Sequence, residues 1–153
     1  MAKNTGRKEL IDRLNGDLSR EYQAIIAYVV YSQVLKGAEY MNIAGELEKH
    51  AGEELQHAIT LAKHIDYLGG SPTTKAQPVV ESDDPKVMLR ADLNNELVTI
   101  RNYRERIRQA EALDEFAICE DLREIVRQEQ EHLTDLASAL GVDPPDPATA
   151  GRK

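Results

Sequence analysis

The stretch LEKHAGEELQHAITLAKH, residues 47–64, carries the pattern that decides the fold class. Steps of three and four residues lead from Leu47 through Glu54 and His57 to Leu61, which is the spacing of one face of an α-helix. This face is apolar at both ends but carries Glu-x-x-His in its middle. Because an unpaired ionisable group is costly to bury, the pattern predicts a helix that brings a carboxylate and an imidazole into a polar site within a core.

The same motif recurs near the carboxyl end of the chain, at Glu129 and His132. Two other helical stripes each carry a single central glutamate, Glu21 on the first and Glu96 on the third. The expected helix ends are Gly37, Gly69 with Gly70, the break near Leu113 and Asp114, and Leu140. The sequence therefore predicts an all-α protein, a bundle of four helices.

An irregular segment of 16 residues runs from Gly69 to Asp84, longer than the short turns of most bundles. Extended, such a segment reaches about 50 Å at ~3.3 Å per residue, enough to run along a helix of about 45 Å. It predicts two antiparallel hairpins joined by one long crossover. Asp84 as N-cap with Pro85 predicts the third helix start, and the Pro-rich tail, residues 141–153, is expected to be disordered without a fifth helix.

Composition limits the class of protein. With 153 residues the chain is expected to be a single domain, residues 1–153, with a helical core of about residues 8–140. Its net charge of -8 disfavours nucleic-acid binding. No stretch approaches the roughly 18 apolar residues of a membrane span, and no signal peptide is evident. Cys119 is the single cysteine, so no disulfide framework is expected and a cytoplasmic location fits best.

The spacing of the central glutamates supports one shared site, since 33 residues separate Glu21 from Glu54 and also Glu96 from Glu129. In an antiparallel hairpin, residues equidistant from the turn lie at the same height, so the four carboxylates should form one layer with the two histidines beside them. Two divalent cations would offset their charge. The mixed oxygen and nitrogen donors suit iron or manganese better than zinc. The predicted metal ligands are Glu21, Glu54, His57, Glu96, Glu129 and His132.

This ligand pattern resembles that of the bacterioferritins, within the ferritin-like di-iron superfamily, over about residues 9–140. The resemblance implies a ferritin-like four-helix bundle whose two iron ions form a ferroxidase centre. It implies that Fe(II) is oxidised there with O2 or H2O2 and that Fe(III) passes to a mineral core inside a homo-oligomeric cage. The expected function is iron storage and detoxification.

The resemblance also implies a role for each residue of the site. Glu54 and Glu129 would bridge the metals, with Glu21 and His57 completing one side and Glu96 and His132 the other. Tyr28 and Tyr103, each seven residues after a ligand glutamate, match tyrosines that support the ligands in that family.

Two departures from the family pattern concern haem and cage size. The family holds haem through a Met directly after the bridging glutamate, but Leu55 stands there, so no haem is expected by that route. The Pro-rich tail replaces the family's fifth helix, which leaves cages of 12 and 24 subunits both open. The bacterioferritin-like members with smaller cages typically carry a cysteine pair, which Cys119 cannot provide.

Other polar residues near the stripes have simpler interpretations. His50 and His64 lie on the second stripe without matching partners, so capped or partly exposed side chains are expected rather than ligands. Glu53 is expected to be solvated, although it could guide cations. Arg101, Arg104, Arg106 and Arg108 are interleaved with glutamate, which favours a charged outer face or a subunit contact over a DNA-binding surface.

The same ligand set serves other functions. One alternative is a stand-alone di-iron oxygenase or manganese catalase, but such enzymes usually add a substrate pocket or a longer chain. Another is a Dps-like protective cage that only sequesters metal, and sparse basic residues at the amino terminus count against its DNA-binding form. The choice of metal in the cell, the oxidant and the reductant for iron release stay open.

Overall fold

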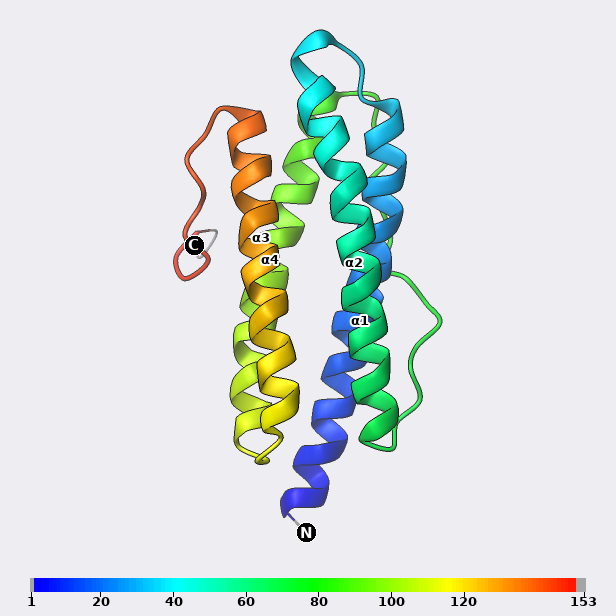
Figure 1. Ribbon diagram of the computed structural model, residues 1–153, viewed down its shortest axis with the longest axis vertical. Helices are drawn as coiled ribbons and strands as arrows, with labels where there is room; N and C mark the ends of the chain where they lie inside the picture. Colours follow the sequence, from blue (N-terminus) through cyan, green and yellow to red (C-terminus); the bar gives the residue numbers. More distant parts are fainter. Residues whose placement is uncertain (1, 151–153) are drawn as a thin grey trace.

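The computed structural model describes residues 2–150 as a four-helix bundle (Figure 1). Helices α1 (Ala2–Val34) and α2 (Met41–Tyr67) form an antiparallel hairpin, with a 3-10 turn, η1 (Ala38–Tyr40), between them. Helices α3 (Pro85–Glu111) and α4 (Phe116–Leu140) form the second hairpin, α1 also packs on α3, and α2 packs on α4. The predicted all-α bundle is confirmed, and none of these helices is long and apolar enough to cross a membrane.

Local sequence sets the ends of α3 and α4. The Asp84 side chain accepts a hydrogen bond from the Lys86 backbone N–H at 2.9 Å, and Pro85 is the first helical residue. Helix α4 ends at Gly141, whose φ of 68° is the left-handed conformation that glycine adopts without a steric penalty. Both boundaries agree with the sequence prediction.

Helix α1 begins at Ala2, earlier than the start near residue 8 that the sequence predicts. The side chain of Arg7 links this first part of the helix to the rest of the bundle. Its Nε donates a hydrogen bond to the Leu68 carbonyl at 3.0 Å, and its terminal nitrogen lies 3.4 Å from the Glu115 carboxylate. These long-range contacts stabilise the first turns, and helical periodicity alone does not reveal them.

The crossover between α2 and α3 lies along α1. Successive contacts join Asn15 to Thr73, Ser19 to Gln77, Gln23 to Pro78 and Tyr31 to Val80. The partners advance along both segments in the same direction, so the crossover runs parallel to α1. This arrangement confirms the single long crossover, and it lets α3 start at the same end of the bundle as α2.

The described part of the tail, residues 141–150, contains no helix but lies against the bundle (Figure 1). Arg101 of α3 donates a hydrogen bond from Nε to the Pro147 carbonyl at 2.5 Å and another from its terminal nitrogen to the Ala150 carbonyl. Ala150 also packs against the apolar core. The predicted disorder is therefore wrong for these residues, and residues 151–153 lie outside those described.

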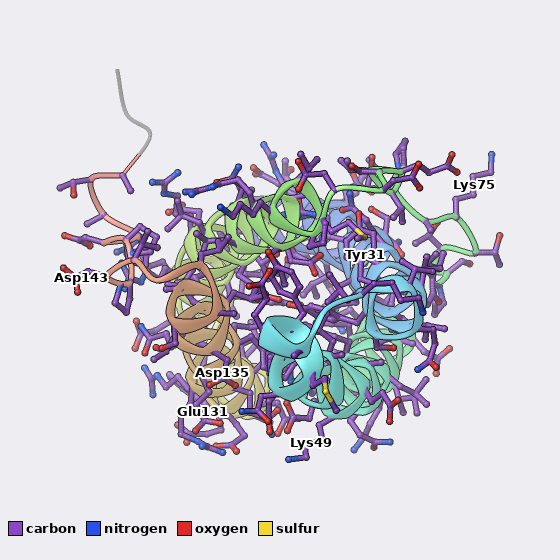
Figure 2. All side chains as sticks on the ribbon, turned by 90° about the horizontal axis from the view of Figure 1, so that it is seen from above. Tyr31, Lys49, Lys75, Glu131, Asp135 and Asp143 are labelled. Atoms are coloured by element: carbon purple, nitrogen blue, oxygen red, sulfur yellow. The ribbon has the colours of Figure 1, made fainter. Side chains whose placement is uncertain are left out.

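The core consists of two apolar clusters, one containing Leu47 and the other containing Leu14. Between them lies a layer of buried ionisable side chains drawn from all four helices. Seen along the bundle, charged side chains such as Lys49, Lys75 and Glu131 lie at the periphery (Figure 2). Along the bundle axis, the polar layer is therefore flanked by apolar packing on both sides.

Arg106 does not lie on the charged outer face that the sequence predicts for the arginines of α3. Its side chain is 5% exposed, and its guanidinium contacts both carboxylate oxygens of Asp17 on α1, at 2.6 and 3.1 Å. The outer-face prediction is wrong for this residue. The planar fork of arginine matches a carboxylate, which allows the pair to be buried between α1 and α3.

Candidate metal centre

Six buried side chains from the four helices meet between the two apolar clusters. Each of these residues is at most 3% exposed, and they are Glu21, Glu54, His57, Glu96, Glu129 and His132. They form two overlapping groups of four, in each of which the possible ligand atoms lie within 4.8 Å of one another. The structure thus brings all six predicted ligands together in one layer, as the 33-residue spacing indicates. Their role in binding metal stays a prediction.

Glu54 and Glu129 lie between the two histidines. Glu54 places Oε2 at 3.0 Å from His57 Nδ1 and Oε1 at 2.9 Å from His132 Nδ1. Glu129 places Oε1 at 3.2 Å from His57 Nδ1 and Oε2 at 3.1 Å from His132 Nδ1. Each carboxylate therefore directs one oxygen to each half of the centre, which is what a ligand shared by two metals requires.

Glu21 and Glu96 each belong to one half of the centre. Glu21 Oε2 lies 3.7 Å from His57 Nδ1, and Glu96 Oε1 lies 3.6 Å from His132 Nδ1. They occupy the outer ends of the layer, on α1 and α3. The two halves are therefore Glu21 with His57 and Glu96 with His132.

Tyr28 and Tyr103 hydrogen-bond the two outer glutamates. The Tyr28 hydroxyl donates to Glu96 Oε1, and the Tyr103 hydroxyl donates to Glu21 Oε1. Each tyrosine thus contacts the glutamate of the opposite helix and not the one seven residues before it. Each tyrosine lies two helical turns beyond the glutamate of its own helix, and its side chain reaches across the α1–α3 interface. The hydrogen bond therefore depends on how these two helices pack.

Burial and neighbouring charges shift the pKa values of the clustered groups in both directions, and those of Glu21 and Glu129 are lowered. Burial, together with the nearby charge of Glu129, raises the pKa of Glu54 well above its ordinary value and raises the pKa of Glu96 to about 7. Burial alone would lower the pKa of His57 and of His132, but adjacent carboxylates, Glu129 foremost, raise both pKa values strongly. A metal ion that binds these groups must therefore displace protons.

The donor set fits two divalent cations. Within the six-residue centre, five buried carboxylate oxygens accept no well-formed hydrogen bond from residues 2–150: Glu21 Oε2, Glu54 Oε1, Glu96 Oε2 and both oxygens of Glu129. Buried acceptors without partners are costly and uncommon. These oxygens line one layer together with two imidazole Nδ1 atoms, so coordination to cations would satisfy them all.

A model of the ferritin-like domain, the Ferritin family, matches residues 11–144. The chain belongs to the ferritin-like family. It is 30% identical over 143 residues to the bacterial ferritin of Paramagnetospirillum magnetotacticum, covering 90% of this chain and 85% of that protein. It is 28% identical over 129 residues to the bacterioferritin of Desulfovibrio desulfuricans, covering 84% and 72% respectively.

A solved structure is similar to this ferritin-like chain over most of its length. It is described as the crystal structure of ferritin like, diiron-carboxylate proteins from Bacillus anthracis str. Ames. The TM-score is 0.85 at 33% sequence identity, with 88% of this chain and 97% of that chain covered. Together these similarities confirm the superfamily that the ligand pattern resembles.

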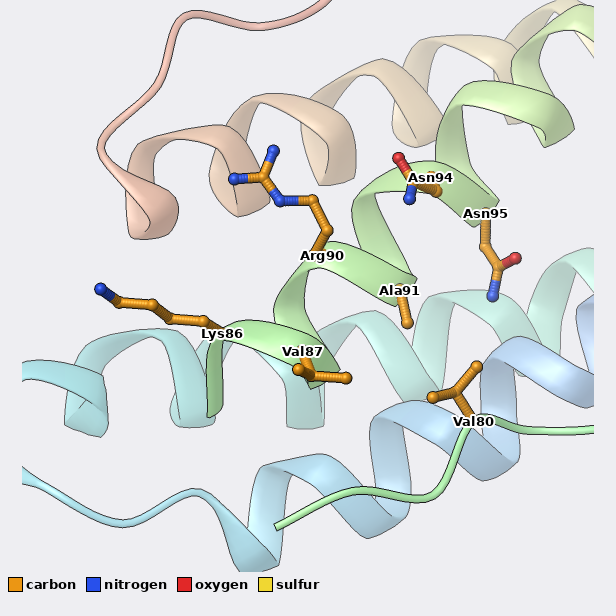
Figure 3. Close-up of a pocket in the computed structure, with 7 residues that line it drawn as sticks. All are labelled: Val80, Lys86, Val87, Arg90, Ala91, Asn94 and Asn95. Carbon is orange, nitrogen blue, oxygen red and sulfur yellow. The ribbon is translucent and has the colours of Figure 1, made fainter. Parts of the chain in front are cut away.

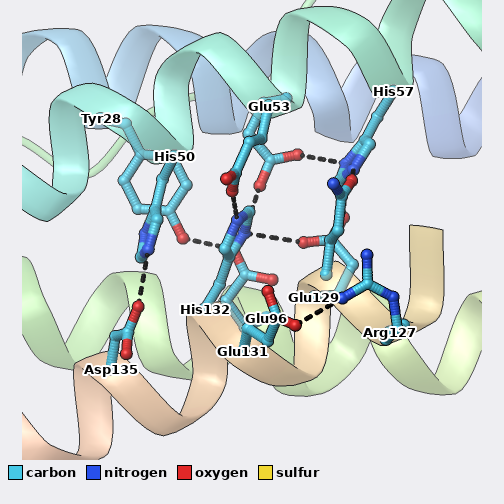
Figure 4. A network of polar contacts seen from close by, with 12 residues as sticks. Tyr28, His50, Glu53, His57, Glu96, Arg127, Glu129, Glu131, His132 and Asp135 are labelled. Carbon is cyan, nitrogen blue, oxygen red and sulfur yellow. Dashed lines mark hydrogen bonds and ion pairs between the residues drawn. The ribbon is translucent and has the colours of Figure 1, made fainter. Parts of the chain in front are cut away.

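The outer nitrogens of the two histidines contact residues that the sequence did not identify as their partners, and Figure 4 shows Glu53 beside His132. His57 Nε2 lies 2.5 Å from Gln128 Oε1, and His132 Nε2 donates to Glu53 Oε2. An Nε2–H that donates outward leaves the lone pair of Nδ1 facing the carboxylates. The expectation that Glu53 is merely solvated is wrong. The signal was the register between α2 and α4, because 53 with 132 and 57 with 128 follow one antiparallel pairing.

His50 and His64 are buried on the same α2–α4 interface, at 2% and 6% exposed. Their Nε2 atoms lie 3.1 Å from Asp135 Oδ2 and 2.7 Å from Asp121 Oδ2, so both are capped by a carboxylate, as one of the two expectations has it. The expectation of partial exposure and of no matching partner is wrong. The His50 ring also stacks on His132, with 3.9 Å between centroids. Both side chains extend the polar interface beyond the six-residue centre.

Surface hollows differ in whether they reach the centre. A hollow between the crossover and α3, lined by residues including Val80 and Val87, contains none of the six residues (Figure 3). A narrow cleft between α1 and α3 is lined by Arg20 and by four of them. Arg20 donates to the Asn95 carbonyl at 2.9 Å and to Thr99 Oγ1 at 3.1 Å. The cleft has a free volume of about 10 Å³, which is room for about one water molecule.

Proposed function

We propose that this protein is a ferroxidase that oxidises Fe(II) at the six-residue centre and stores the resulting Fe(III) in a homo-oligomeric cage. The observation that carries the proposal is the placement of Glu54 and Glu129, each with one oxygen toward either half of the centre. Hard carboxylate oxygens with two imidazoles suit iron. Membership of the ferritin-like family and the bacterioferritin relatives support iron as the metal.

The chain's own groups account for binding and charge balance. Binding of two cations releases the protons of the metal-free centre, after which four carboxylates offset the cationic charge. Glu54 and Glu129 would hold both metal ions, Glu21 and Glu96 would hold one each, and the tyrosine hydroxyls orient the outer two glutamates. The iron, when bound, supplies the one-electron chemistry toward O2 or H2O2. The apolar clusters on either side limit access of water.

The test combines solution mass with aerobic addition of Fe(II). We expect a large particle that retains many irons per subunit, with fast growth of ferric absorbance. The double variant Glu54→Gln with Glu129→Gln should lose the fast phase, while Glu105→Gln, which changes an exposed glutamate of α3, should retain it. A monomer that never retains more than two irons would contradict storage, and fast oxidation by the double variant would contradict the assigned site.

The proposal includes assembly into a cage of 12 or 24 subunits without haem at Leu55. Exposed apolar side chains on the neighbouring helices α1 and α2 support a subunit contact, and they are Ile26, Val29, Val30, Leu55 and Ile59, each at least 44% exposed. Leucine has no donor atom for haem iron. Mass measurement decides the subunit number, and a Soret band in the purified protein would contradict the haem-free proposal.

A further inference from the structure

The centre has an internal pseudo-symmetry. Adding 75 to a residue number in the first hairpin gives its counterpart in the second, as in the pairs Glu21 and Glu96, Glu54 and Glu129, His57 and His132, and Tyr28 and Tyr103. Each pair has the same residue type and corresponding contacts. Next to the bridging glutamates the symmetry breaks, because the counterpart of Glu53 is Gln128.

Glu53 and Gln128 occupy matching places against the two ligand histidines. Glu53 Oε2 accepts the hydrogen bond of His132 Nε2, and Gln128 Oε1 lies 2.5 Å from His57 Nε2. In both cases an oxygen from the facing helix contacts the outer nitrogen of the imidazole, and Figure 4 shows the contact of Glu53 with His132. The two contacts therefore have the same geometry and differ by one formal charge.

The charge difference acts on the metal through the histidine. A carboxylate that accepts an imidazole N–H makes the other ring nitrogen a stronger donor, and the hydrogen bond to a charged acceptor is roughly twice as strong as one to a neutral amide. The Glu53 side chain is 39% exposed, so solvent screens part of its direct field, but its hydrogen bond reaches a ring only 1% exposed. The half that contains His132 is thus the more strongly donating half.

The other charges near the outer partners of the two histidines lie at the surface. Glu124 interacts electrostatically with His57, and Lys49 with Glu53. The side chains of Glu124 and Lys49 are 59% and 69% exposed and each has a partner at the surface, so solvent screens their charges. Beside Glu21, Asp17 and Arg106 form a buried bidentate pair at 2.6 and 3.1 Å. Gln128 is the outer partner of His57 on α4. Among the described residues, the outer nitrogen of His57 therefore has an amide as its hydrogen-bond partner, whereas that of His132 has a carboxylate.

We infer that the two metal positions are unequal and fill in order. The position of Glu96 and His132, supported by Glu53, takes the first divalent cation and holds it more tightly. The position of Glu21 and His57, supported by Gln128, is the weaker and more exchangeable one. This inference rests on the proposed function, since it assumes that metal ions bind this centre.

The test is an anaerobic titration of the assembled protein with Co(II). Calorimetry and visible absorption monitor the binding. We expect two binding steps per subunit whose affinities differ by about tenfold or more, the range found for lost outer partners of metal-bound histidines. Glu53→Gln should weaken the first step by about tenfold and bring the two steps together. His132→Ala should remove the tight step, and His57→Ala the weak one.

A charge swap separates this inference from simple damage to the fold. Gln128→Glu should strengthen the weak step, a gain that a misfolded variant cannot produce, and E53Q with Q128E together should move the tight step to the His57 half. Glu131→Gln is the matched control, because Glu131 is an exposed glutamate beside His132 that pairs with Arg127 and does not contact the histidine. It should leave both steps unchanged.

Two results would overturn the inference: equal affinities in the unaltered protein, or a Glu53→Gln titration that matches Glu131→Gln. Failure of the unaltered protein to bind any Co(II) would contradict the metal centre itself. The two kinds of failure are therefore distinguishable.

Discussion

At the scale of single residues, the centre depends on which carboxylate faces which imidazole. Glu129 approaches both histidines within 3.2 Å, whereas Glu21 approaches only His57, at 3.7 Å. Both carboxylates are buried, so bulk water does not take the place of either as a ligand. Their loss should therefore have different consequences for the two metal positions.

Glu129→Gln should weaken both Co(II) binding steps, each by at least about 100-fold, because a shared anionic donor becomes a neutral amide. Glu21→Gln should weaken one step strongly and the other only slightly. Calorimetric titration of the two variants at one pH checks this. Two equally affected steps in Glu21→Gln would contradict the assignment of Glu21 to one half.

At the scale of helices, contacts between the hairpins place the ligands. Arg106 of α3 and Asp17 of α1 form a buried ion pair one turn from Glu21. Burial raises the pKa of Asp17 although Arg106 acts to lower it, which indicates how strongly the site is desolvated. The pair fixes the height of α1 against α3 and contributes no metal ligand.

Arg106→Ala should lower the free energy of unfolding by about 3–5 kcal/mol, because it leaves a buried carboxylate without its partner. Combining Arg106→Leu with Asp17→Asn should recover much of this loss, since both charges are then removed together. Denaturant unfolding of the metal-free proteins measures both effects. A double variant as unstable as the single one would contradict the buried-charge explanation.

The contact between Arg101 and the tail allows a separate prediction. Arg101→Ala removes the hydrogen bonds to the Pro147 and Ala150 carbonyls, so residues 141–150 should become accessible to proteases. Helix stability should change by less than about 1 kcal/mol, because the bundle core is untouched. Limited proteolysis with mass spectrometry measures the cleavage, and Arg104→Ala is the comparison. Equal cleavage of the two variants would contradict the role of Arg101.

At the scale of the whole molecule, metal binding is linked to pH. The pKa of Glu96 is raised to about 7, and the pKa values of Glu54 and both histidines are raised as well. For Glu96, a raised pKa means that protonation stabilises the fold fully below the ordinary pKa of a glutamate, and this contribution is lost as pH rises to about 7. Metal binding requires the opposite protonation state.

Co(II) affinity should therefore fall as pH falls from about 8 to 6, and binding should release protons. The gain in melting temperature on adding Co(II) should shrink over the same interval, because fewer proteins have a deprotonated centre. Titration in buffers of different ionisation enthalpy counts the protons released. An affinity that does not change with pH would contradict protonated ligands in the metal-free centre.

Sequence alone determined the features that depend on local periodicity and on distance from a turn. The stripes indicated four helices, Asp84 and Pro85 marked the start of α3, and equal spacing across two hairpins placed the glutamates in one layer. These inferences hold because spacing along the sequence determines which residues share a helix face and which lie at the same height in a hairpin. They were sufficient for the bundle and for the six clustered side chains.

Tertiary structure decided the features that depend on how each helix is rotated about its axis and in what register it meets its neighbours. The exchange of Tyr28 and Tyr103 between helices, the supports Glu53 and Gln128, and the tail bound by Arg101 are all of this kind. A side chain on one helix can contact residues that differ by a turn on the adjacent helix. The spacing of residues within one helix does not determine which of these contacts forms. Packing between α1 and α3 and between α2 and α4 makes that choice.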